Sequence, residues 1–133
     1  MSSIPLPNKN NNPGNVKASN VTSTFATKDA NGNPVVDRQG HLIFPSVTAG
    51  INALASDIRA KIAGGSSWMP ANPTMAQLGS VYAEDGGWTK GVLSILKRDF
   101  GTSYSPTTPA SAIPFDNLIV AITRQEGFRP DLA

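Results

Sequence analysis

The sequence predicts a mainly α-helical domain of the α+β kind, with a small hairpin or extended region in its first third. Four stretches carry apolar residues at helical spacing, which is typical of helices with one buried face. Residues 16–45, before them, mix β-branched residues with turn signals. A chain of 133 residues with 12 Gly and 11 Pro suits one loop-rich domain, so we expect residues 1–133 to form a single domain.

The N-terminal part is expected to lack regular helices. Residues 1–15 are polar and rich in Asn and Pro, which is typical of a loop. Turns at Asn31-Gly32 and Gln39-Gly40 flank short apolar runs at 35–36 and 41–44, and this pattern predicts a small hairpin or an extended loop.

Three helices are expected in the rest of the domain body, residues 1–96. Ser46 or Thr48 can cap the first, and Gly64-Gly65 ends it. Thr74 can cap a second, short helix, and the third begins near Trp88. Their apolar faces consist of Val47, Ile51, Leu54, Ala55, Ile58 and Ile62, then Met75, Leu78 and Val81, then Trp88, Val92, Ile95 and Leu96.

Residues 97–113 are expected to form a linker, because their centre is rich in Ser, Thr and Pro. The last helix and the tail occupy residues 114–133. Pro114 suits the first helical position, Asp116 suits the first turn, and Gly127 suits the end. Phe115, Leu118, Ile119 and Ile122 form its apolar face.

Composition excludes several classes of function. The net charge is +2 without a run of Lys or Arg, so a nucleic-acid interface is not indicated. There is no Cys and only one His, His41, so disulfides are excluded and neither a metal site nor a cofactor is expected. Residues 1–7 do not have the pattern of a signal peptide, and no apolar run reaches membrane-spanning length, so no membrane insertion is expected.

Glu126 is the candidate for chemistry. It is one of two Glu residues and closes an apolar-faced helix. Neighbouring apolar groups can partly bury such a carboxyl and raise its pKa, as a general acid requires. The spacing alone is also compatible with an alternative in which Glu126 is a solvated residue at a helix end without a catalytic role.

The segment Gln125-Glu126-Gly127-Phe128 resembles the catalytic-glutamate segment of lysozyme-like domains, the lytic transglycosylases among them, of phage and bacterial proteins. In that family a motif of the type Asn-Asn-Pro-Gly-Asn follows the Glu helix. In this chain the motif is residues 11–15, so it comes before the Glu helix. Segments 40–46, 49–54 and 74–83 resemble the family in its own order. The resemblance therefore implies a circularly permuted domain, with the Glu helix moved to the C-terminal end and the two ends close together.

The resemblance implies a peptidoglycan-degrading enzyme that cleaves the β-1,4 bond between N-acetylmuramic acid and N-acetylglucosamine, with Glu126 as general acid and base. A two-carboxylate glycosidase needs a second acid. The candidates, none in a compelling context, are Asp29, Asp37, Glu84 and Asp85. Their weak context favours the transglycosylase route to a 1,6-anhydro sugar over the muramidase route, and both stay open.

Other residues are candidates for substrate binding. Asn11, Asn12 and Asn15 are expected beside Glu126, although they can also cap a tight turn at Pro13-Gly14. Tyr82 can contact substrate or lie half-buried in the core. Trp68, in a Ser/Pro loop, can stack on a sugar, whereas Trp88 and His41 are expected to be structural.

The setting implied is a phage endolysin or virion-associated enzyme, made in the host cytoplasm and acting on glycan strands of the periplasmic cell wall. The linker allows a monomer or a domain-swapped dimer. Two alternatives are a non-catalytic virion or tail protein that keeps the lysozyme-like fold, and a wall-binding module.

Overall fold

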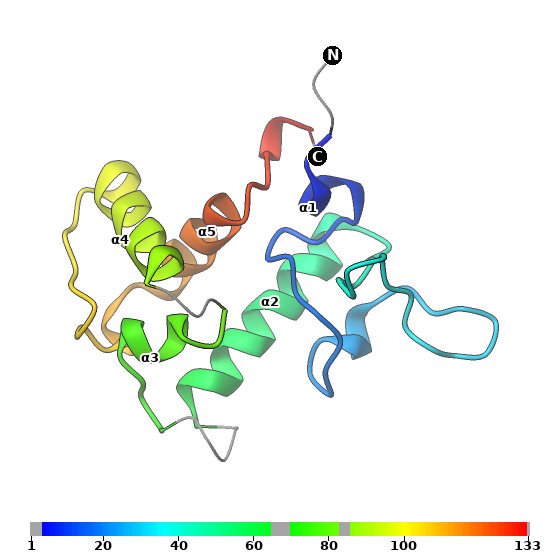
Figure 1. The fold of residues 1–133 in the computed structure, drawn as a ribbon, viewed down its shortest axis with the longest axis horizontal. Helices are drawn as coiled ribbons and strands as arrows, with labels where there is room; N and C mark the ends of the chain where they lie inside the picture. The colour runs from blue at the N-terminus through cyan, green and yellow to red at the C-terminus, as the bar shows by residue number, and fades with distance from the viewer. Residues whose placement is uncertain (1–3, 65–69, 83–85, 133) are drawn as a thin grey trace. The chain divides into compact units, whose positions relative to one another are not determined.

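The computed structural model describes residues 4–64, 70–82 and 86–132, and it is mainly helical, as predicted (Figure 1). The chain forms two compact units. The "end unit" combines the N-terminal residues up to Asp57 with the C-terminal residues from Glu126, and the "middle unit" runs from Ile58 to Gln125. The elements, in chain order, are α1 (Leu6–Lys9), the 3-10 helix η1 (Ser23–Phe25), α2 (Val47–Ile62), α3 (Met75–Gly79), α4 (Gly87–Phe100), η2 (Ala110–Ala112), α5 (Phe115–Gln125) and η3 (Pro130–Leu132).

Helix α2 begins and ends as its sequence predicts. The Ser46 hydroxyl accepts a hydrogen bond from the Ala49 N–H at 3.1 Å, so Ser46 rather than Thr48 is the cap. After Ile62 the chain turns through Gly64, whose φ of 79° suits a glycine. Leu54 and Ile58 are fully buried, as the apolar periodicity predicts, but Ile51 of the predicted face is exposed and Val47, Ala55 and Ile62 are half-buried.

The extended region of the end unit is a set of isolated antiparallel bridges. Lys17 pairs with His41, Lys28 with Pro34, and Val36 with Leu42, and no longer strand occurs in the described part of the chain. The two turns between the paired segments are closed by the side chains of Asp29 and Asp37, which accept hydrogen bonds from the turn N–H groups. The predicted hairpin is therefore present in irregular form.

The middle unit is built on α4, which packs against α5 and α3. Thr74 and Gln77 form a reciprocal capping box at the start of α3, as the position of Thr74 predicts. The largest fully buried side chains of this unit are Ile58, Met75, Leu78, Val92, Leu96, Leu118 and Ile122. Trp88 is also buried, as predicted.

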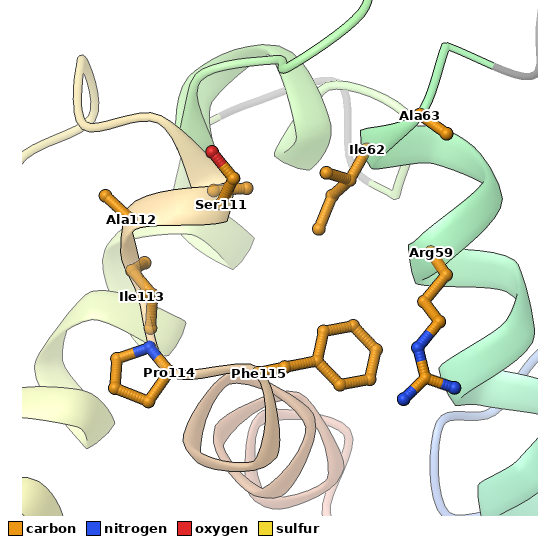
Figure 2. Close-up of a pocket in the computed structure, with 9 residues that line it drawn as sticks. Arg59, Ile62, Ala63, Ser111, Ala112, Ile113, Pro114 and Phe115 are labelled. Atoms are coloured by element: carbon orange, nitrogen blue, oxygen red, sulfur yellow. The ribbon is translucent and has the colours of Figure 1, made fainter.

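A pocket of about 620 Å³ opens in the middle unit (Figure 2). Its walls come from the last turn of α2, from η2 and from the residues that lead into α5. They are Arg59, Ile62, Ala63, Ala110, Ser111, Ala112, Ile113, Pro114 and Phe115.

The Ser/Thr/Pro segment differs from the expected linker in two ways. Helix α4 continues to Phe100 and ends at Gly101, whose φ is 77°, so residues 97–100 are helical. The segment then folds back onto α3: the N–H groups of Met75 and Ala76 donate to the carbonyls of Thr108 and Pro106, each at 2.9 Å. These bonds fix the loop, and α5 packs on α4 of the same chain. Among the helices of the described residues, none has the length and apolar character needed to cross a membrane.

Candidate active site

Glu126 directly follows α5, at the point where the chain enters the end unit. Gly127 has a φ of 89°, a left-handed conformation that glycine adopts at helix ends without steric cost. Phe128 is buried, and Glu126 is half-buried. The glutamate thus stands between a helix end and an apolar anchor, and it makes further interactions of its own.

The tail beyond Glu126 is attached to α1 by Asn8. The Asn8 side-chain amide donates to the Arg129 carbonyl at 2.8 Å, and its Oδ1 accepts from the Arg129 N–H at 2.9 Å. The Asn8 side chain therefore pairs with both the N–H and the carbonyl group of Arg129, as the backbone of a neighbouring β-strand would. In Figure 1 the C-terminal segment lies beside α1. Segments more than 120 positions apart are thus joined within one unit.

The motif at residues 11–15 is packed closely on α2. A Cβ atom at Gly14 would lie 2.7 Å from Cδ1 of Leu54, well inside a normal carbon–carbon contact. A Cβ atom at Gly50 would overlap the Asn11 carbonyl oxygen and lie 2.8 Å from Cδ of Pro13. Two glycines, one on the loop and one on the helix, therefore allow this approach.

The three asparagines predicted to bind substrate differ in their surroundings. Asn12 is fully buried: its amide donates to the carbonyls of Val16 and Leu42, and its Oδ1 accepts from the Val16 N–H, each at 2.9 Å. These three hydrogen bonds stabilise the backbone of the loop. Because the Asn12 side chain is fully buried, it is not accessible to a substrate. The prediction of substrate contact at Asn12 overlooked that a short polar side chain can be used entirely by neighbouring backbone.

Asn11 and Asn15 are half-buried and have left-handed backbones, with φ of 51° and 52°. The Asn11 amide donates to the Phe44 carbonyl at 3.1 Å. The Oδ1 of Asn15 is buried and has no hydrogen-bond partner among the described residues. An unsatisfied buried acceptor is costly, and strained backbone and unsatisfied groups gather at functional sites, so Asn15 is the more distinctive of the two.

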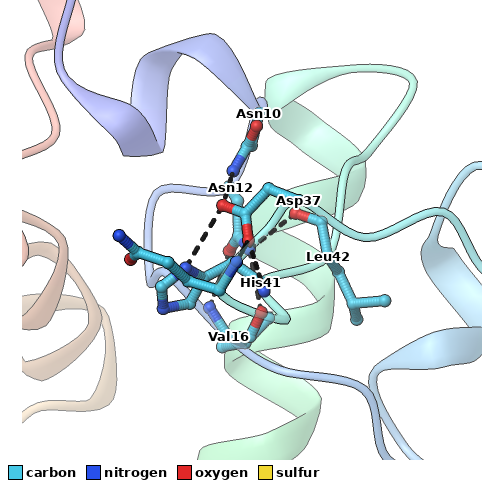
Figure 3. Close-up of polar contacts among 7 residues, drawn as sticks. Asn10, Asn12, Val16, Asp37, His41 and Leu42 are labelled. Carbon is cyan, nitrogen blue, oxygen red and sulfur yellow. Dashed lines mark hydrogen bonds and ion pairs between the residues drawn. The ribbon is translucent and has the colours of Figure 1, made fainter.

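Asp37 holds a polar cluster beside this loop (Figure 3). Its Oδ1 accepts the N–H groups of Gln39 and His41 at 2.8 and 2.9 Å. Its Oδ2 accepts from the Asn10 amide at 2.9 Å and lies 3.3 Å from Nδ1 of His41. Burial acts to raise the pKa of Asp37, but these hydrogen bonds, that of the His41 N–H foremost, outweigh it and lower the pKa from 3.8 to about 2.

This cluster bears on the search for a second carboxylate. Asp37 is ionised at neutral pH, and its oxygens accept hydrogen bonds from its own turn and from Asn10, which suits a structural role. Asp29 is exposed, and its Oδ1 accepts the N–H groups of Asn31 and Asn33 in its own turn. Glu84 and Asp85 lie outside the described residues. No group of three His, Asp or Glu side chains suited to a metal ion occurs among residues 4–64, 70–82 and 86–132.

Tyr82, the aromatic candidate among the described residues, belongs to the middle unit. Tyr82 is half-buried, and its ring stacks on Trp88 with 4.6 Å between ring centroids and 11° between planes. The Nζ of Lys61 lies 5.4 Å from the Tyr82 ring centroid. This stack anchors the ring on α4 and favours the core interpretation of Tyr82. Trp68 lies outside the described residues.

Sequence reasoning missed Asn8 and Asn10, although both belong to the Asn-rich run that drew attention to residues 11–15. The available signal was the tendency of Asn side chains to replace backbone partners. No protein-family model matches the chain, and no curated protein or solved structure matches it either.

Proposed function

We propose that the protein is a peptidoglycan-cleaving enzyme of the lysozyme and lytic transglycosylase class, circularly permuted, with Glu126 as its catalytic acid. The observation that carries the proposal is the joining of the two chain ends. Glu126 and the residues that follow it belong to the same compact unit as the Asn-rich residues 8–15, and the paired hydrogen bonds between Asn8 and Arg129 link the two segments. A permuted domain needs this arrangement, because its two motifs come from opposite ends of the chain.

The surroundings of Glu126 also support the role. A general acid must be held in a fixed position and partly shielded from water. Burial of Phe128 two positions later and the Asn8 attachment three positions later hold the chain that follows Glu126. The half-buried carboxyl keeps the partial access that a polymer substrate requires.

The proposed reaction uses Glu126 twice. As an acid, it gives its proton to the oxygen of the leaving sugar while the β-1,4 bond to C1 of N-acetylmuramic acid breaks. As a base, it then takes the proton of the C6 hydroxyl, whose oxygen bonds to C1 and forms the 1,6-anhydro product. This route needs no second carboxylate, which suits a site where Asp37 and Asp29 serve their own turns. Asn15 is the residue we expect to hydrogen-bond the substrate: it is half-buried, and a rotation of its side chain would bring the buried Oδ1, which lacks a partner among the described residues, to the surface.

The test is the clearing of a suspension of purified cell walls. We expect Glu126→Gln to lower the rate at least about 100-fold, the lower range of a lost general acid, with unchanged thermal unfolding. Asp116→Asn is the matched control, because it neutralises an exposed acid at the opposite end of the same helix. Equal rates for wild type and Glu126→Gln would contradict the role of Glu126.

The products and the binding separate the alternatives. Mass spectrometry that finds 1,6-anhydro ends supports the transglycosylase route, whereas reducing ends alone assign hydrolysis. A wild-type protein that sediments with walls without clearing them is a wall-binding module. One that neither binds nor clears walls fits the virion or tail protein.

A further inference from the structure

The pocket of the middle unit has the size and the lining of a small-molecule site. Its volume of about 620 Å³ lies within the range of roughly 300–1,000 Å³ usual for such sites. Its walls are mostly small and apolar, and Figure 2 shows Ile62 and Phe115 facing across it. The methyl groups of Ala63, which follows α2, and of Ala110 and Ala112 in η2 leave room for a ligand with small side chains.

Arg59 lies at this pocket and has no acidic partner among residues 4–64, 70–82 and 86–132. The Cζ of Arg59 lies 4.5 Å from the centroid of the Phe115 ring, so the guanidinium is stacked on an aromatic face. Stacking leaves the N–H groups in the guanidinium plane available as donors. The other two arginines of this unit, Arg98 and Arg124, both bind Asp99, whereas Arg59 forms no ion pair with any described residue.

The pocket also has a polar group, the hydroxyl of Ser111, on the wall formed by η2. The Ser111 hydroxyl donates to Oδ1 of Asn72, which leaves the Ser111 oxygen free to accept a hydrogen bond. The pocket therefore offers a stacked guanidinium for a carboxylate, an acceptor for an N–H group, and walls of methyl size. A phosphate would use the first feature alone, whereas the end of a short peptide uses all three.

We propose that this pocket binds the carboxylate end of a short peptide with alanine-sized side chains, with Arg59 pairing to the carboxylate. Peptidoglycan carries short alanine-containing peptides with free carboxylates, so the pocket would give the enzyme a second hold on its substrate. That last link rests on the proposed function, whereas the binding itself does not and is tested without activity.

The test is titration of the full chain with trialanine, followed by calorimetry or by NMR shifts of residues 110–115. We expect saturable binding of trialanine, at least tenfold weaker binding of the amide-capped peptide, and at least tenfold weaker binding to Arg59→Gln. Arg38→Gln is the matched control, because it removes an exposed arginine of the end unit, and we expect it to bind as wild type. Thermal unfolding checks that both variants fold.

Three results would overturn the proposal: no binding of trialanine, equal binding of the free and capped peptides, or inorganic phosphate binding as tightly as trialanine. Peptide binding by a protein that does not clear walls leaves this site standing and rejects only the proposed function. A protein that clears walls but does not bind the peptide leaves the proposed function standing and rejects the peptide site.

Discussion

Replacing Gly50 by alanine tests how closely residues 11–15 lie on α2. Alanine is the better helix former, by about 1 kcal/mol, so propensity alone predicts a more stable protein. The added Cβ, however, would overlap the backbone oxygen of Asn11 and lie 2.8 Å from Cδ of Pro13, where carbon atoms normally stay about 3.5–4.0 Å apart. The loop must move, and overpacking of this kind costs about 1–3 kcal/mol. After the gain in helix propensity is subtracted, we expect a net loss of up to about 2 kcal/mol in the free energy of unfolding.

Gly91→Ala is the matched control. A Cβ there would overlap Oε1, Cδ and Nε2, which form the flexible end of the Gln125 side chain and can move at little cost. We expect Gly91→Ala to raise stability by about 0.5–1 kcal/mol, so in urea unfolding it should be more stable than Gly50→Ala by about 0.5–3 kcal/mol. Slower wall clearing by Gly50→Ala alone would further tie the loop to the site. If both substitutions stabilise the protein alike, the packing of residues 11–15 on α2 is not as described.

Two further predictions concern the polar contacts of the end unit. Asn8→Ala should speed amide hydrogen exchange at Arg129 and lower kcat more than it raises KM, because it removes both hydrogen bonds that hold the tail after Glu126. Asn8→Asp keeps the acceptor and should have a smaller effect. Unchanged exchange at Arg129 in Asn8→Ala would argue against the attachment of the tail to α1. Asp37 has a folded-state pKa of about 2, below its ordinary 3.8, so it stabilises the fold above about pH 4 and loses that contribution as the pH falls toward 2. The difference in unfolding free energy between wild type and Asp37→Asn should therefore shrink over that interval in denaturant titrations, and a constant difference would contradict the role of the carboxylate.

The helices were the part of the fold that local sequence could predict. Capping by Ser46 and Thr74 and the left-handed turn at Gly64 depend on residues within a few positions, so their signals are contained in short windows. The Ser/Thr/Pro segment was less predictable. Its composition is that of a linker, yet its carbonyls accept hydrogen bonds from the start of α3, some thirty residues away in sequence. Composition indicates how flexible a segment is by itself, but it does not show which distant residues form hydrogen bonds with that segment in the fold.

The candidate site divides in the same way. The sequence by itself pointed to Glu126, to the motif at residues 11–15 and, through the order of the segments, to an exchange of chain ends. Only the tertiary structure decided which polar groups are used internally: Asn12 is consumed by Val16 and Leu42, Asp37 by its own turn and Asn10, while Oδ1 of Asn15 keeps no partner among the described residues. The physical reason is that a hydrogen bond depends on which donor and acceptor meet across the fold. Residue type fixes what an asparagine can donate or accept, and only the packing of distant segments fixes what it finds.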